Sequence, residues 1–149
     1  MRDSSEVLTG RVLVVDDEPA NVLLLERLLR GAGFVEVSST MDPHEVCDLH
    51  RQNRYDLILL DLQMPGRDGF RVLEGLKEIE KGSLPSVLVM SAHPANEPQV
   101  RDAGATDFIS KPFHTVEVLT KVYNLLELRL HQSRSGPQTT SRLTGAEGA

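Results

Sequence analysis

The sequence predicts a three-layer α/β domain built on a parallel five-stranded sheet. Five short apolar runs alternate with five helix-like stretches, and the runs are continuous, which is typical of strands covered by helices on both faces. Polar residues follow four of the runs directly, namely Asp16 with Asp17, Asp61, Ser91 and Lys111. Because ligands bind at the carboxyl ends of strands in open parallel sheets, these residues predict a single polar site.

Composition limits the classes of protein that the chain can belong to. Its 149 residues suffice for one domain with a buried core but not for two. The formal net charge is -6 and the few aromatic residues are not interleaved with Arg or Lys, which disfavours a nucleic-acid surface. The single cysteine, Cys47, is expected to pack as a small hydrophobe. Without a membrane-length apolar run or a signal-peptide pattern, we expect a cytoplasmic protein that binds neither nucleic acid nor membrane.

The first strand and the first helix follow a polar lead. Residues 1–10 are expected to be flexible, and residues 12–15 are predicted to be the first strand. Pro19 suits the first turn of a helix, where a missing N–H costs little, and Gly33 suits the end of that helix. The apolar face predicted for this helix consists of Ala20, Leu24, Leu28 and Ala32.

Two further strand and helix units follow. Residues 34–38 are predicted to be the second strand, and Asp42 is predicted to cap a helix whose first residue is Pro43. Residues 57–60 are predicted to be the third strand, and residues 64–69 have the composition of a turn that leads into a helix. The residues expected to face the core from these two helices are Val46 with Leu49 or His50, and then Val72, Leu73, Leu76 and Ile79.

The last two strands flank a short helix. Residues 86–90 and 107–109 are predicted to be strands four and five. Pro94 and Pro98 confine the helix between them to a short piece that ends at Gly104.

The final helix carries two apolar stripes. It is expected over residues 115–131, and residues 132–149 are expected to be a disordered polar tail. One stripe would suffice for packing on the sheet. The second stripe indicates either a wide buried face or a surface for a homodimer or another partner. The two stripes consist of Val116, Leu119, Tyr123, Leu126 and Leu130, and of Val118, Val122 and Leu125.

Three carboxylates, a lysine and a hydroxyl define the predicted chemistry. The spacing leaves the strand order open, but the order 2-1-3-4-5 would bring Asp16, Asp17 and Asp61 together. Such carboxylates repel one another, and a hard divalent cation relieves the repulsion, with Mg²⁺ fitting best. Lys111 and the Ser91 hydroxyl suit two oxygens of a phosphoryl group. The set therefore predicts a phosphoryl site.

At these positions the chain resembles the receiver domain of two-component response regulators. The resemblance covers about residues 11–129 and implies a flavodoxin-like, doubly wound sheet in the order 2-1-3-4-5 with five flanking helices. It implies a receiver domain over residues 11–131 that works as a phosphoprotein in a phosphorelay. The matching motifs are the acidic pair Asp16-Asp17, residues 61–69, Ser91 and residues 111–113.

The resemblance implies roles for the site residues. Asp61 would be the phosphoacceptor, a nucleophile that takes a phosphoryl group from phosphohistidine on a histidine kinase or a phosphotransfer protein, and the receiver itself would catalyse the transfer. Mg²⁺ would be bound by Asp17, Asp61 and the backbone carbonyl of Gln63, with Asp16 acting mainly through water. Lys111 would contact the phosphoryl group.

Further residues would respond to the phosphate or set its lifetime. By the resemblance, Ser91 would move toward the phosphate, and Phe108 would be the switch aromatic that rotates inward after it. Gln63 and His93, each two residues past Asp61 and Ser91, would tune dephosphorylation. An aromatic in a strand is otherwise an ordinary core residue, and a loop histidine is otherwise a solvated one.

Partner contacts are expected on two surfaces. The resemblance implies kinase recognition at the start of the first helix, beside the Pro112-Phe113 loop, and a downstream protein target on an output surface. The segment between Ser91 and Lys111 is shorter than is common in the family, so the fourth helix, which usually helps to form the output surface, should be short or displaced. The kinase contact is expected around Glu18, Pro19, Asn21 and Leu24.

Other interpretations remain open. An aspartate-nucleophile phosphatase of the haloacid dehalogenase type uses similar groups, but its nucleophile lies in an Asp-x-Asp segment after the first strand, where this chain has Asp16-Asp17-Glu18-Pro19. A phosphorylation-independent scaffold would usually lack an acid or the lysine. Only 38 residues follow Lys111. The chain is therefore expected to be a single-domain regulator or a receiver fragment of a larger protein, such as a cyclic-dinucleotide phosphodiesterase.

Overall fold

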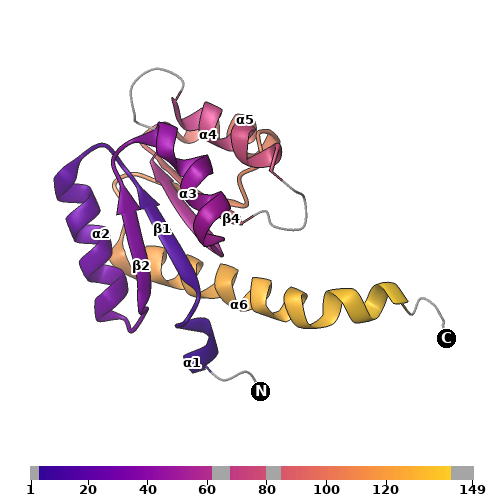
Figure 1. Ribbon diagram of the computed structural model, residues 1–149. Coiled ribbons are helices and arrows are strands. Elements are labelled where there is room, and N and C mark those ends of the chain that lie inside the picture. Colours follow the sequence, from indigo (N-terminus) through magenta and orange to yellow (C-terminus); the bar gives the residue numbers. More distant parts are fainter. Residues whose placement is uncertain (1–3, 62–67, 80–84, 142–149) are drawn as a thin grey trace.

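A five-stranded sheet forms the middle layer of the molecule (Figure 1). The computed structural model describes residues 4–61, 68–79 and 85–141. All neighbouring strands are parallel and their order is β2-β1-β3-β4-β5, which confirms the predicted topology. The strands are β1 (Arg11–Val15), β2 (Glu36–Thr40), β3 (Leu57–Asp61), β4 (Ser86–Ser91) and β5 (Asp107–Ser110).

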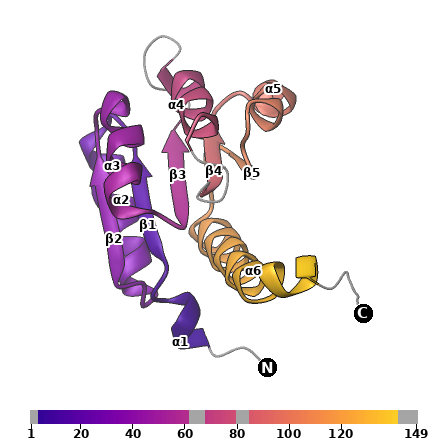
Figure 2. The ribbon, with the colours of Figure 1, turned by 45° about the vertical axis from the view of Figure 1, so that its right-hand side comes forward.

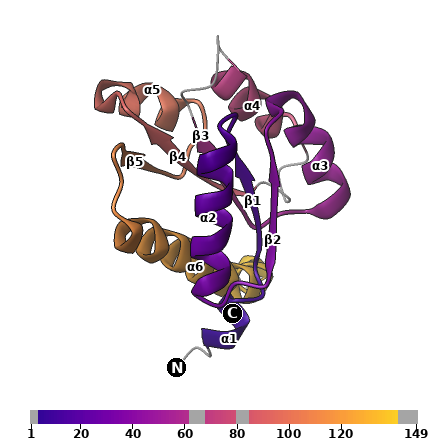
Figure 3. The same cartoon turned by 90° about the vertical axis from the view of Figure 1, so that its left-hand side faces the viewer.

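Helices cover both faces of the sheet. Helices α2 and α6 lie on one face, and α3, α4 and α5 lie on the other (Figures 2 and 3). No helix in the described part of the chain has the length and apolarity that crossing a bilayer requires. The helices are α1 (Ser4–Val7), α2 (Pro19–Gly31), α3 (Val46–Asn53), α4 (Asp68–Lys77), α5 (Glu97–Asp102) and α6 (Thr115–Ser141), with 3₁₀ turns η1 (Pro43–Glu45) and η3 (Pro94–Asn96).

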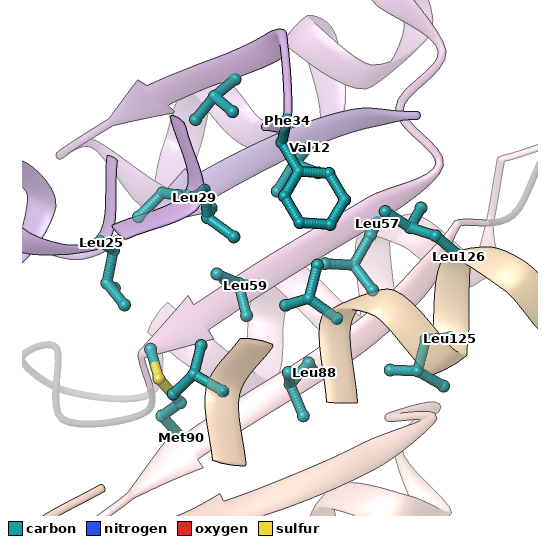
Figure 4. Close-up of a cluster of buried hydrophobic side chains, with 14 of the residues drawn as sticks. Val12, Leu25, Leu29, Phe34, Leu57, Leu59, Leu88, Met90, Leu125 and Leu126 are labelled. Atoms are coloured by element: carbon teal, nitrogen blue, oxygen red, sulfur yellow. The ribbon is translucent and has the colours of Figure 1, made fainter. Parts of the chain in front are cut away.

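The strands divide their side chains between two apolar cores. In β1, Val12 and Val14 point to the core under α2 and α6, while Leu13 and Val15 point to the core under α3, α4 and α5. Successive side chains of a strand point to opposite faces, so a strand buried on both faces needs a continuous apolar run. Figure 4 shows part of the first core, where residues from α2, β3 and α6 meet. The labelled residues are Val12, Leu25, Leu29, Phe34, Leu57, Leu59, Leu88, Met90, Leu125 and Leu126.

The predicted start of the second helical segment is confirmed. The Asp42 side chain accepts a hydrogen bond of 2.9 Å from the His44 N–H, and Pro43 is the first residue of η1. This turn continues into α3, where Val46 and His50 are fully buried, as expected for an inward face. Cys47 is partly buried against the core of this face, as the sequence predicted.

The predicted apolar face of α2 is wrong except at Leu28, which is partly buried against the core. The helix buries Val22, Leu25 and Leu29, whereas Leu24 is 46% exposed. Consecutive leucines fit two adjacent stripes of a helix, and the way the chain crosses from β1 onto the sheet decides which of them is buried.

The second strand begins two residues later than predicted. Strand β2 starts at Glu36, and Phe34 precedes it as a buried loop residue that is only 3% exposed. An apolar side chain can reach the core from a loop as well as from a strand, and a short run does not distinguish the two cases.

Both ends of the described chain contain more helix than predicted. The lead was expected to be flexible, whereas Ser4–Val7 is helical and Val7 is 1% exposed. Helix α6 continues to Ser141, ten residues past the expected end at His131. Gly136 and Pro137 disfavour a helix interior, which is why the sequence pattern placed the end earlier. The remainder of the predicted tail, residues 142–149, lies outside the described residues.

The second apolar stripe of α6 belongs to the core. Val118 and Val122 are fully buried and Leu125 is 8% exposed, while Val116 from the first stripe is 72% exposed. The wide buried face is therefore the correct interpretation, and the second stripe is not a surface on which a homodimer could form.

Candidate functional site

Parallel pairing brings four strand ends to one edge of the sheet. Val15 pairs with Leu60, so Asp16 and Asp61 are the next residues on adjacent strands. Ser91 pairs with Ser110 at the ends of β4 and β5, which places Lys111 one residue further along the same edge. The topological switch point between β1 and β3 is the position at which open α/β sheets bind their ligands.

Three carboxylates cluster at this edge. Each of Asp16, Asp17 and Asp61 offers an oxygen within 4.8 Å of the others, and the Asp16 and Asp61 side chains are buried while Asp17 is exposed. Two of the acids are thus removed from water and the third opens the cluster to solvent. Such a set of oxygen ligands suits a hard divalent cation that keeps some of its waters.

Asp16 is held in place on one side only. Its Oδ1 accepts a hydrogen bond of 2.9 Å from the Glu18 N–H, an Asx turn that the sequence analysis did not predict. Its Oδ2 is buried and has no hydrogen-bond partner within the described part of the chain. Burial, with the nearby Asp61 charge, raises the pKa of Asp16 to about 6 against the opposing Glu18 hydrogen bond. A cation beside Asp16 would satisfy the buried oxygen, so the site fits Mg²⁺.

Lys111 reaches across the edge to Asp61. Its Nζ lies 2.8 Å from Asp61 Oδ1. The Lys111 backbone N–H donates a 2.8 Å hydrogen bond to the Ser91 carbonyl, which anchors the residue to β4, and the peptide bond between Lys111 and Pro112 is cis. A positive point charge next to a buried carboxylate is the arrangement that a phosphoryl site needs.

The remaining predicted residues lie at different distances from this cluster. Ser91 is fully buried at the end of β4, and its Oγ accepts a 3.0 Å hydrogen bond from the His93 N–H, while the His93 side chain is exposed. Phe108 is 7% exposed and packs in the core under α3, α4 and α5. Gln63 lies outside the described residues. The segment after Ser91 forms η3 and the six-residue α5, which is short as predicted.

This strand order, with an acidic cluster that faces a lysine at the carboxyl edge, defines the class of phosphoryl-accepting α/β domains. The chain belongs to the response regulator receiver domain family, whose family model matches residues 12–123. Receiver domains of this family take phosphoryl groups from histidine kinases in two-component signalling and bind Mg²⁺ in their acidic site.

Relatives with this domain have different overall lengths. The transcriptional regulatory protein PrrA of Mycobacterium tuberculosis is 38% identical over 89% of this chain, which spans 57% of PrrA. The response regulator PleD of Caulobacter vibrioides is 36% identical over 83% of this chain, which spans 27% of PleD. Hybrid signal transduction histidine kinase L of Dictyostelium discoideum is 38% identical over 90% of this chain, which spans 8% of the kinase. The chain thus corresponds to one part of each relative.

Solved structures share the fold. A signal receiver domain from Bermanella marisrubri is 28% identical, with a TM-score of 0.72 over 79% of this chain and 98% of that one. The receiver domain of sensor histidine kinase PA1611 from Pseudomonas aeruginosa, which has a magnesium ion coordinated in its active site cleft, is 25% identical, with a TM-score of 0.71 over 80% of this chain and 98% of that one.

Proposed function

We propose that this receiver accepts a phosphoryl group on Asp61 and signals through a surface that changes with phosphorylation. The observation that supports this most directly is the buried Asp61 carboxylate, which lies 2.8 Å from the Lys111 ammonium and next to two other acids. An Asp61 oxygen attacks the phosphorus of a phosphohistidine, the phosphorus–nitrogen bond breaks, and the histidine nitrogen leaves with the electron pair and takes up a proton. The product is an acyl phosphate on Asp61.

Several residues around Asp61 would each stabilise part of the negative charge of the transferred phosphoryl group. Lys111 would bind one phosphoryl oxygen and the Ser91 hydroxyl would donate to another. Asp17, Asp61 and the backbone carbonyl of Gln63 would hold a Mg²⁺, with Asp16 acting mainly through water, and the bound ion supplies positive charge to the phosphoryl oxygens.

The response to phosphorylation would begin at Ser91. A shift of its hydroxyl toward the phosphate requires it to give up the hydrogen bond from the His93 N–H, which connects the site to the following loop. Phe108, at the edge of the core under α3, α4 and α5, would rotate further inward as the switch aromatic. Gln63 and His93 would tune the rate at which the phosphate is lost.

A histidine kinase or phosphotransfer protein would dock at the start of α2. Glu18 and Pro19 are exposed there and Leu24 is 46% exposed, which leaves apolar surface near the site for a partner. The expected contact also includes Asn21 and the Pro112-Phe113 loop. The output would pass to a downstream protein in the cytoplasm, or to further domains if the chain is part of a longer regulator, as the matching segment is in PrrA and PleD.

The proposal is tested by intact mass after incubation with acetyl phosphate and Mg²⁺, with and without a chelator. Wild type should gain one phosphoryl group only when Mg²⁺ is present, and Asp61→Asn should gain none. Asp48→Asn is the matched control, because Asp48 is an exposed aspartate that forms a surface ion pair with Arg51. Full labelling of Asp61→Asn would overturn the assignment of Asp61, and steady turnover of a generic phosphomonoester would favour the phosphatase instead.

A further inference from the structure

Residues 4–10, which we call the N-terminal clasp, lie against the last helix. Helix α1 contacts α6 at the end of the molecule where the strands begin (Figures 1 and 3). Val7 is 1% exposed and belongs to the same apolar core as Leu125 and Leu126 of α6. The clasp is therefore an integral part of the packed domain.

The clasp backbone approaches α6 closely at Gly10. A Cβ atom at Gly10 would lie 3.0 and 3.2 Å from the two δ-carbons of Leu126 and 3.3 Å from the Val7 carbonyl oxygen. Contacts this short mean that even a methyl group at position 10 would push the Leu126 side chain by a few tenths of an ångström, and a branched residue would push it further.

A second set of contacts ties the clasp to the loop between α2 and β2. The Leu8 carbonyl accepts a 3.2 Å hydrogen bond from the Val35 N–H. The Leu8 side chain lies over Gly33, and a Cβ atom at Gly33 would lie only 3.1 Å from Leu8 Cδ1. The φ angle of Gly33 is +106°, a backbone conformation that also favours glycine. Leu8 also lines, with Phe34, Leu119 and Tyr123, a hollow of about 460 Å³ between the clasp, this loop and α6.

Hydrogen bonds within the clasp give it a fixed shape. The Thr9 hydroxyl donates to the Glu6 carbonyl over 2.7 Å, and the Gly10 N–H donates to the Val7 carbonyl over 3.1 Å. These bonds lie within the clasp, so the clasp packs against α6 as one small unit.

Helix α6 extends well beyond the residue that the clasp holds. The 15 residues from 127 to 141 correspond to about 22 Å of helix at about 1.5 Å per residue. This end of α6 runs away from the body of the domain (Figures 1 and 2). A small tilt of α6 at Leu126 would therefore become a larger displacement at its end.

We propose that the N-terminal clasp is a conformational control element whose opening lets α6 tilt at Leu126, and so changes the direction of its projecting C-terminal end, while the phosphoryl-accepting edge of the sheet stays intact. The geometry favours this separation, because the clasp leads into the first residue of β1 whereas Asp16, Asp61, Ser91 and Lys111 lie at or just past the opposite ends of their strands. Closed, the clasp fixes the direction in which α6 leaves the domain.

Hydrogen exchange measured by mass spectrometry on the full chain tests the proposal. Gly10→Val should displace Leu126 and accelerate exchange of the amides of residues 119–131 at least tenfold, with the amides of β3 and β4 unchanged. Gly31→Val is the matched control, because among the described residues no atom outside its own helix and chain neighbours lies within 4 Å of a Cβ at Gly31. Unchanged exchange in α6, or equal acceleration in the strands, would overturn the proposal.

A milder variant keeps the test decisive if Gly10→Val fails to fold. Leu8→Ala removes the side-chain contact with Gly33 and one wall of the hollow. It should accelerate exchange of the amides of residues 119–131 about threefold or more, again with the amides of β3 and β4 unchanged. The acetyl phosphate adduct of Leu8→Ala should form at the wild-type rate. The exchange result stands by itself even if wild type forms no adduct, so failure of the phosphoacceptor assignment and failure of the clasp can be told apart.

Discussion

The ammonium group of Lys111 and the carboxylate of Asp61 form a 2.8 Å ion pair between residues 50 positions apart in the chain. Their side chains are only 19% and 3% exposed. The attraction between the two charges offsets part of the free-energy cost of burying them. Removing one partner takes this attraction away from the other, which is strongly destabilising. The pair therefore links the chemistry of the site to the stability of the fold.

Replacing Lys111 with Met should destabilise the metal-free protein. We expect a loss of about 3 kcal/mol in the free energy of unfolding, because the buried Asp61 carboxylate loses the ammonium group that lies beside it. Urea unfolding in the presence of a chelator measures this loss. Lys77→Met is the control, since Lys77 is exposed and donates a hydrogen bond to the Asp102 carbonyl, and its effect should stay below about 1 kcal/mol. Equal losses in both variants would show that the pair with Asp61 has no special weight.

The raised pKa of Asp16 makes the stability of the metal-free protein dependent on pH. The folded chain holds this proton up to about pH 6 whereas the unfolded chain releases it near 3.8, so this carboxyl lowers the free energy of unfolding as pH rises between those values. The loss should reach about 2 to 3 kcal/mol by pH 7. Asp16→Asn should therefore be more stable than wild type at pH 7 and not at pH 4.

Thermal or urea unfolding of wild type and Asp16→Asn across this pH range, with chelator, gives the comparison. Added Mg²⁺ should stabilise wild type at pH 7, because a cation offsets the charge of the ionised cluster. A difference between the two proteins that does not change with pH would contradict this account of Asp16.

Two adjacent leucines of α2 should differ strongly in their contribution to stability. Leu25 is fully buried in the core under α2 and α6, and Leu25→Ala should cost about 2 to 5 kcal/mol. Leu24 is 46% exposed, and Leu24→Ala should change stability by less than about 1 kcal/mol. Urea unfolding of the two variants decides whether α2 has the observed face or the one first predicted, in which the costs would be reversed.

Removal of the His93 imidazole should change loss of the phosphate more than its acquisition. The hydrogen bond to Ser91 comes from the His93 backbone, so His93→Ala keeps it while the exposed ring is lost from the loop next to the site. Rates of phosphorylation by acetyl phosphate and of subsequent dephosphorylation, both followed by intact mass, provide the measurement. Changes of equal size in the two rates would exclude a specific effect on phosphate lifetime.

The edge of the sheet that carries the site could be predicted from the sequence because two local signals indicate where a strand ends. Each of the runs before Asp16, Asp61 and Ser91 is continuous and apolar, and each ends at a polar residue. Both signals are local, so pairing of parallel strands was enough to bring the residues together.

Features that depend on tertiary packing could not be predicted from local sequence patterns. The choice between Leu24 and Leu25 rests on how α2 crosses the sheet, and nothing in a run of leucines records that angle. Val7 and Leu8 are the only neighbouring apolar residues in an otherwise polar lead, too few to form a periodic pattern, so the burial of Val7 against α6 left no signal in the sequence. The Glu18 N–H that holds Asp16 belongs to the backbone, which every sequence supplies alike.

Because residues at the ends of β1, β3, β4 and β5 each contribute one part of the site, no single strand with its helix can build it, and the segment that holds all the parts spans residues 16–111. During synthesis Asp16, Asp17 and Asp61 leave the ribosome well before Lys111, so a nascent chain carries the acids without their cationic partner. Contacts between residues this far apart form late, since the chain must first close a long loop. A chain still on the ribosome therefore completes the ion pair between Lys111 and Asp61 only when β5 has been placed beside β4.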